Sequence, residues 1–157
     1  MEVRKGEHPL GDVGQLVLLG FFLVIWILDS FILHRSTFLS DYIPLVLRLV
    51  ILSITLIIAV YLFKSGHVVV HEQRPAGVIS TGAFKYVRHP LYLASILGYL
   101  GLTFSTASLF SLASFAVIVL FYNYIAGHEE KLLEAKWGDS YIAYKKKTGR
   151  WFPGIGK

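Results

Sequence analysis

The chain has 157 residues, of which 55% are hydrophobic and only 16% are charged. Soluble domains average about 45–50% apolar and about 25% charged residues, so this composition predicts a single integral-membrane domain over residues 1–157. The sequence contains no cysteine, which excludes disulfides, thiolate nucleophiles and cysteine-ligated metals.

Two apolar stretches in the N-terminal part are each long enough to cross a bilayer. Val13–Leu33 and Ile43–Phe63 each contain 21 residues, and a hydrocarbon core of about 30 Å requires roughly 20. We expect these two spans to make up residues 1–63, ahead of a cofactor-binding catalytic half at 64–157.

A helical hairpin is predicted in the catalytic half. Its arms are Leu91–Phe104 and Leu109–Ala126, with a turn at Ser105-Thr106. The first arm is marginal for crossing alone because its 14 residues extend only about 21 Å as a helix. The fold expected is therefore an all-α membrane protein with about four transmembrane helices.

The distribution of basic residues predicts the orientation of these helices. With the N-terminus inside, four crossings place thirteen of the fifteen lysines and arginines on the cytosolic side, whereas Arg35 lies outside and Arg48 lies within a span. This asymmetry follows the positive-inside rule and predicts that both termini are cytosolic. Charges in lipid usually pair, so we expect a structural contact between Asp29 and Arg48.

The segment Arg88-His89-Pro90-Leu91-Tyr92 joins a polar loop to the hairpin. Pro90 suits the first turn of a helix, which puts His89 beside unsatisfied backbone donors at the positive end of the helix dipole. Together with Arg88, this arrangement favours a bound carboxylate or phosphate. The same residues would also suit an interfacial anchor, with Tyr86 and Tyr92 in the aromatic belt.

Metal binding is not expected. His67 and His71 have the four-residue spacing of a helical metal-binding pair, but the sequence offers no matching cluster of further histidines or cysteines.

A second ionisable cluster, His128-Glu129-Glu130, follows the last apolar stretch. Adjacent residues on a helix point about 100° apart, so we expect only one of the two glutamates to face a given partner. An amphipathic cytosolic helix should follow.

The C-terminal segment contains two further features. The basic run Lys145–Lys147 suits an anionic lipid surface. The aromatic segment Arg150-Trp151-Phe152-Pro153 is expected to fold back over the cytosolic mouth of the bundle.

The segments Gly82–Tyr92, Glu129-Glu130, Trp137–Tyr144 and Arg150–Pro153 together resemble the isoprenylcysteine carboxyl methyltransferase and phospholipid methyltransferase superfamily. The resemblance covers roughly the C-terminal half, from Gly77 onward. It implies that S-adenosylmethionine binds on the cytosolic side, between the hairpin and the C-terminal segment, and that a lipophilic acceptor enters from the bilayer.

The resemblance also implies a set of site residues. Catalytic roles are expected for Arg88, His89, Glu129 and Glu130. Contacts with the cofactor are expected from Tyr86, His89, Pro90, Leu91, Tyr92, Asn123, Glu129, Glu130, Arg150 and Trp151. Neither nucleic acid nor an obligate protein partner is expected.

The sequence leaves the acceptor open, with the carboxylate of a lipophilic, isoprenylcysteine-like molecule preferred. An ionised carboxylate needs no general base, whereas the amine of a phospholipid would need one, such as His128 or a glutamate. The chain is much shorter than the eukaryotic prenyl-protein enzymes, which leaves little surface for a protein substrate. An NADPH-dependent enzyme resembling sterol reductases and a non-catalytic lipid-binding protein are also compatible with the sequence.

Overall fold

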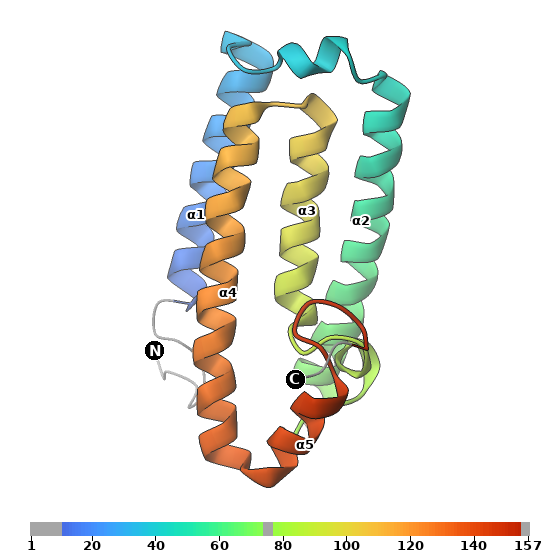
Figure 1. Ribbon diagram of the computed structural model, residues 1–157, viewed down its shortest axis with the longest axis vertical. Coiled ribbons are helices and arrows are strands. Elements are labelled where there is room, and N and C mark those ends of the chain that lie inside the picture. The colour runs from blue at the N-terminus through green and yellow to red at the C-terminus, as the bar shows by residue number, and fades with distance from the viewer. Residues whose placement is uncertain (1–10, 74–76, 155–157) are drawn as a thin grey trace.

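The computed structural model describes residues 11–73 and 77–154, which form a bundle of long helices (Figure 1). The long helices are α1 (Gly11–Ile27), α2 (Leu45–His67), α3 (Pro90–Thr106) and α4 (Leu109–Trp137), followed by the shorter α5 (Asp139–Lys147). Helices α1 and α2 continue into π-helical turns η1 (Leu28–Leu33) and η3 (Val68–Gln73), and single 3₁₀ turns occur at η2 (Phe38–Asp41) and η4 (Gly82–Lys85).

The helices run alternately up and down, so their connections gather at two ends (Figure 1). The α1–α2 connection and the α3–α4 turn lie at one end. The start of α3, the end of α4 and all of α5 lie at the other. Both ionisable clusters of the sequence therefore lie at the same end of the bundle.

Within residues 11–73 and 77–154, three segments are long and apolar enough to cross a membrane: Val13–Leu33, Leu45–Val70 and Leu109–Trp137. Helix α3 has 17 residues and extends about 25 Å, which is a little less than a hydrocarbon core of about 30 Å. The chain is an all-α integral membrane protein, as the sequence predicts.

Helix α4 is longer than the predicted arm that ends at Ala126. Gly127 lies inside regular helix, and α4 ends only at Trp137, where Gly138 adopts a positive φ of 51°. The predicted amphipathic cytosolic helix is thus partly an extension of α4, and α5 follows it. This extension places Glu129 and Glu130 about one turn beyond Ala126.

Helices α2 and α3 approach each other closely at Gly101. A Cβ atom at this position would lie 2.3 Å from Thr55 Oγ1, so only glycine permits the observed spacing. On the other side of α3, the buried core consists of side chains from α1, α3 and α4: Phe22, Tyr99, Ile118, Tyr122 and Ile125.

The predicted contact between Asp29 and Arg48 is wrong. Asp29 is 2% exposed and accepts hydrogen bonds from the hydroxyls of Ser36 (2.5 Å) and Ser108 (2.6 Å), besides two backbone N–H groups. Arg48 instead donates to the carbonyl oxygens of Ser105 (2.9 Å) and Ile43 (3.2 Å). Each charged side chain forms hydrogen bonds with other groups, so neither needs the other.

The turn between α3 and α4 falls two residues later than Ser105-Thr106. Ala107 adopts a left-handed conformation (φ 54°), and Ser108 caps α4 by accepting a hydrogen bond from the N–H of Ser111 at 3.0 Å. A serine side chain that satisfies an unpaired N–H is a typical start of a helix.

Candidate functional site

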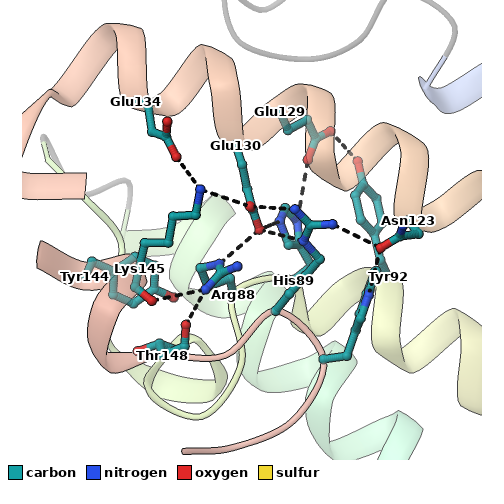
Figure 2. A network of polar contacts seen from close by, with 12 residues as sticks. Arg88, His89, Tyr92, Asn123, Glu129, Glu130, Glu134, Tyr144, Lys145 and Thr148 are labelled. Atoms are coloured by element: carbon teal, nitrogen blue, oxygen red, sulfur yellow. Dashed lines mark hydrogen bonds and ion pairs between the residues drawn. The ribbon is translucent and has the colours of Figure 1, made fainter. Parts of the chain in front are cut away.

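The two ionisable clusters meet around Glu130 (Figure 2). The Glu130 side chain is only 2% exposed, and its Oε1 accepts hydrogen bonds from Arg88 Nε (2.9 Å) and Arg150 Nε (2.9 Å). Its Oε2 accepts from Arg150 Nη2 at 2.8 Å and lies 3.8 Å from Lys145 Nζ. One carboxylate at the end of α4 thus joins the segment before α3, helix α5 and the C-terminal tail.

Both glutamates face the same partner, so the expectation that only one of them would do so is wrong. His89 Nε2 lies 3.2 Å from Glu130 Oε1, and His89 Nδ1 lies 3.7 Å from Glu129 Oε2. The 100° angle between adjacent helical positions is bridged because an imidazole ring presents two nitrogens on opposite edges. Glu129 also accepts a hydrogen bond from the hydroxyl of Tyr92.

The burial of the His89 ring disfavours a charge on it. Burial lowers the pKa of His89 below its ordinary value, and this effect exceeds the opposing influence of Glu130. In its neutral form, the ring can donate a hydrogen bond to Glu130 when its proton is on Nε2. The other ring nitrogen, Nδ1, faces Glu129.

Arg88 ties the segment before α3 to the end of α5. It is 8% exposed, and its Nη1 donates to the carbonyl oxygens of Thr148 (2.5 Å) and Lys145 (3.2 Å). Its backbone N–H donates to the carbonyl of Gly149 at 2.9 Å. These bonds satisfy the carbonyl groups at the C-terminal end of α5, as basic side chains commonly do.

The C-terminal tail folds back over the cluster, as the sequence predicts. Arg150 Nη1 and Trp151 Nε1 both donate to Asn123 Oδ1, at 3.0 and 3.3 Å. The Trp151 ring lies 5.9 Å from that of His89, which in turn stacks on Tyr92 at 5.6 Å. Phe152 does not take part in this packing and remains 69% exposed.

Three of the predicted residues lie outside the polar network. The side chain of Tyr86 is 47% exposed. Pro90 and Leu91 lie against Gly66 of α2, since a Cβ atom there would be 3.1 Å from Leu91 and 3.4 Å from Pro90. They hold the start of α3 in place.

Lys145 is a member of the network that the sequence pattern does not reveal. The basic run predicts a lipid surface for it, but its Nζ lies 2.5 Å from Glu134 Oε1 and 3.8 Å from Glu130 Oε2. Lys146 and Lys147 are exposed. No local spacing identifies Lys145 within the basic run, because its partners lie on α4 and the chain reverses direction at Gly138.

No group of three or more histidines, cysteines or acidic residues that could hold a metal ion occurs within residues 11–73 and 77–154. The side chain of His71 lies outside the described residues, so the spacing of His67 and His71 remains untested.

A family model for phospholipid methyltransferases matches residues 43–140. The chain belongs to this family. The match extends from just before α2 to the start of α5 and contains His89, Glu129 and Glu130. It reaches further toward the N-terminus than the resemblance, which begins at Gly77, and it leaves α1, Arg150 and Trp151 outside. No curated protein matches the chain significantly.

Family membership makes the chain a membrane methyltransferase, a class whose methyl donor is S-adenosylmethionine. The matched residues include His89, Glu129 and Glu130 of the buried cluster. Ionisable groups at a membrane boundary are costly unless they pair, and here they pair across segments that are far apart in sequence.

Proposed function

We propose that the chain is an S-adenosylmethionine-dependent methyltransferase that methylates the carboxylate of a lipophilic acceptor at the cytosolic face of the membrane. The observation that carries this proposal is the convergence of His89, Glu129 and Arg150, from three separate segments, at one end of the bundle. The excess of lysine and arginine at this end supports a cytosolic location for it and for both termini.

The groups at this end fit the chemistry of S-adenosylmethionine, which carries a carboxylate, an ammonium and a sulfonium. The Glu129 side chain is 15% exposed and suits the ammonium or the ribose hydroxyls. The Arg150 side chain is 28% exposed and suits the carboxylate. The aromatic rings of Trp151 and Tyr92 suit the adenine and the sulfonium, because a cation is attracted to the face of an aromatic ring.

Glu130 and Arg88 are better suited to positioning these groups than to touching a ligand. The Glu130 carboxylate already accepts from two guanidinium groups, and Arg88 is engaged with Glu130 and two carbonyls. We assign them the role of holding His89 and the tail in place. Tyr86, Pro90 and Leu91 remain predicted cofactor contacts.

The preference for a carboxylate acceptor rests on charge. When bound, the cofactor supplies a methyl group on a sulfonium, and transfer breaks that carbon–sulfur bond, forms a carbon–oxygen bond and leaves a neutral thioether and a neutral ester. A reaction that removes both charges is favoured in a dry site of low dielectric constant. No proton is released, so the residues need only align the acceptor and exclude water.

A phospholipid amine is the second candidate, and two observations favour it. The matched family model describes phospholipid methyltransferases. In addition, Nδ1 of His89 lies 3.7 Å from the carboxylate of Glu129, and a neutral imidazole beside a carboxylate can take up the proton that an amine must lose.

The test uses the purified protein in lipid nanodiscs with S-adenosylmethionine labelled on the methyl group. The acceptors are an S-farnesylcysteine acid and phosphatidylethanolamine. We expect a methyl ester, which alkali hydrolyses, whereas an alkali-stable methylamine would favour the second candidate. Binding of NADPH without binding of S-adenosylmethionine, measured by calorimetry, would contradict both.

A matched pair of variants tests the site itself. Glu129→Gln should reduce kcat/KM at least a hundredfold, because it removes the charge that faces the cofactor. Glu134→Gln is the control, since Glu134 lies five residues further along α4 and pairs only with Lys145 in the described part of the chain. Equal activity in the two variants would show that Glu129 has no role in catalysis or binding.

A further inference from the structure

A pocket of about 440 Å³ lies where the end of α2 and its continuation η3 pack against the turn η4. Its volume falls in the range of small-molecule sites. None of the residues that surround Glu130 belongs to its lining, so it is separate from the candidate site. The lining consists of Tyr61, Lys64, Ser65, Val68, Val69, Thr81 and Gly82.

The pocket lies at the boundary between the hydrocarbon core and water. Lys64 follows Leu45, the first residue of α2, by 19 residues, which is about 29 Å along a helix. Because a hydrocarbon core is about 30 Å thick, the amine of Lys64 lies at the level of the lipid headgroups. The side chain of Tyr61, three residues earlier, is 54% exposed, so it borders the acyl chains.

The polar groups of the lining suit a phosphate. Lys64 is exposed, and none of the ion pairs among the described residues involves it. The lining also contains the hydroxyls of Tyr61, Ser65 and Thr81, and it contains no carboxylate. A phosphate oxygen accepts strong hydrogen bonds from an ammonium group and further bonds from hydroxyls. The lining is therefore complementary to an anion.

The wall formed by η4 is closely fitted to α2 and η3. Gly82 has a φ of 57°, and a Cβ atom there would lie 2.8 Å from Val69 Cγ2 and 3.0 Å from Ser65 Oγ. Glycine is therefore required for η4 to lie this close. The backbone N–H of Ala83 donates to Ser65 Oγ at 2.9 Å, which joins the two walls. The pocket is thus a packed feature of the fold.

We propose that this pocket binds the phosphate headgroup of an anionic membrane lipid that is not the methyl acceptor. The ammonium of Lys64 pairs with the phosphate, and basic pockets at the cytosolic side of membrane helices are typical headgroup sites. The acyl chains lie along Ile57 and Ile54, which precede Tyr61 at helical spacing and are 69% and 52% exposed. The inference does not depend on which acceptor the protein methylates.

A lipid in this pocket would stabilise the segment that positions His89. The turn η4 forms one wall of the pocket and ends three residues before Arg88. The carbonyl of Phe84 in this turn accepts a hydrogen bond from the hydroxyl of Tyr144 on α5 at 2.7 Å. The pocket and the candidate site therefore share η4 as a common structural element, which a bound lipid would hold against α2.

The first test measures lipid binding directly, by native mass spectrometry of the purified protein in a nonionic detergent. The ligand is phosphatidylglycerol, whose headgroup has an anionic phosphate but neither an amine nor a carboxylate to methylate. Phosphatidylcholine and glycerol 3-phosphate are the comparisons. We expect phosphatidylglycerol to bind at least about tenfold more tightly than either, because only this ligand combines a net negative charge with acyl chains.

Two substitutions of Lys64 test the role of its charge. Lys64→Gln should weaken the binding of phosphatidylglycerol about tenfold or more, and Lys64→Arg should retain it. Lys131→Gln is the matched control, since it removes the same charge from an exposed position on α4 outside the lining. Its dissociation constant should equal that of the unmodified protein.

Thr81→Phe tests the pocket by filling it. Thr81 precedes η4, and its side chain forms no capping hydrogen bond with that turn. The variant should therefore lose the tight binding of phosphatidylglycerol and keep the melting temperature of the lipid-free protein.

Hydrogen exchange tests the connection to the candidate site. The amides of residues 81–87 should exchange more slowly in nanodiscs that contain phosphatidylglycerol than in nanodiscs of phosphatidylcholine alone, because a bound ligand suppresses local opening. Lys64→Gln should remove this difference, and Lys131→Gln should keep it.

The inference and the proposed function fail on different results, because none of these measurements requires methyl transfer. Equal dissociation constants for the Lys64→Gln and Lys131→Gln variants would overturn the inference, since the lipid would then be held by the general surface charge. Glycerol 3-phosphate that binds as tightly as the lipid, or tight lipid binding to Thr81→Phe, would overturn it as well. Exchange rates at residues 81–87 that do not respond to phosphatidylglycerol would overturn the role of the lipid in supporting η4.

Discussion

The substitution Glu130→Gln should strongly destabilise the protein. Glu130 is 2% exposed and accepts hydrogen bonds from Arg88, whose side chain is 6% exposed, and from Arg150. Glutamine keeps the shape of the side chain but leaves the buried guanidinium of Arg88 without a counter-charge. Removing one partner of a buried ion pair costs about 3–5 kcal/mol. We assign little of the loss to Arg150 and Lys145, because both side chains are more than a quarter exposed.

Glu134→Gln provides the matched control on the same helix. Glu134 and Lys145 are 33% and 30% exposed, and partly exposed pairs of this kind contribute about 0–1 kcal/mol. The measurement is unfolding of each variant in mixed micelles with a rising fraction of dodecyl sulfate, followed by tryptophan fluorescence. The free energies of unfolding should differ by at least about 2 kcal/mol between the variants.

Limited trypsin digestion gives an independent result. Glu130 connects the tail to α4 through Arg150, so Glu130→Gln should expose the tail and speed cleavage after Arg150. Similar unfolding free energies for the Glu130 and Glu134 variants, together with similar cleavage rates, would refute the argument from burial.

Three other predictions concern stability. Burial lowers the pKa of His89 below 6.5, so protonation of this residue favours the unfolded chain. The unfolding free energy should therefore fall by up to about 1.4 kcal/mol per pH unit as the pH drops below 6.5. His89→Gln should flatten this slope. Asp29→Asn weakens a buried hydrogen-bonded network far from the cluster, so it should lower the free energy of unfolding in micelles by about 1–3 kcal/mol. Activity per folded molecule should stay intact. An inactive variant of normal stability would contradict a structural role. Gly101→Ala places a Cβ atom 2.3 Å from Thr55 Oγ1 and should cost about 1–3 kcal/mol, whereas Gly98→Ala meets open space and should be neutral or slightly stabilising in the same assay.

The fold was largely predictable because hydrophobic length determines which segments cross a membrane. The predicted Val13–Leu33 coincides with a membrane-spanning segment of the structure. The end of α4 was not predictable from apolar length, since the helix continues through the polar residues after Gly127. A glycine inside a helix costs only about 1 kcal/mol, which the backbone bonds and pairing of the following turns outweigh.

The members of the candidate cluster were predictable in part. The residue pattern Arg88-His89-Pro90 and the glutamate pair identified the two segments that meet, and the aromatic tail was expected to cover them. The partners of each charge were not predictable, because they depend on which segments lie side by side. Asp29 pairs with serines rather than with Arg48, and Lys145 pairs with two glutamates of α4. In both cases, the partner lies on another helix or beyond a turn.

The geometry around His89 gives the two adjacent glutamates different tasks. Glu130 lies among Arg88, Arg150 and Lys145, so its charge is compensated within the protein and its carboxylate has little left to offer a ligand. Glu129 contacts the hydroxyl of Tyr92 and the ring of His89, and its side chain is 15% exposed, whereas that of Glu130 is 2% exposed. A cation that binds at this end of the bundle would therefore gain more from Glu129. The ring of His89 contacts both carboxylates, one through each nitrogen, so it helps to orient them for these separate roles.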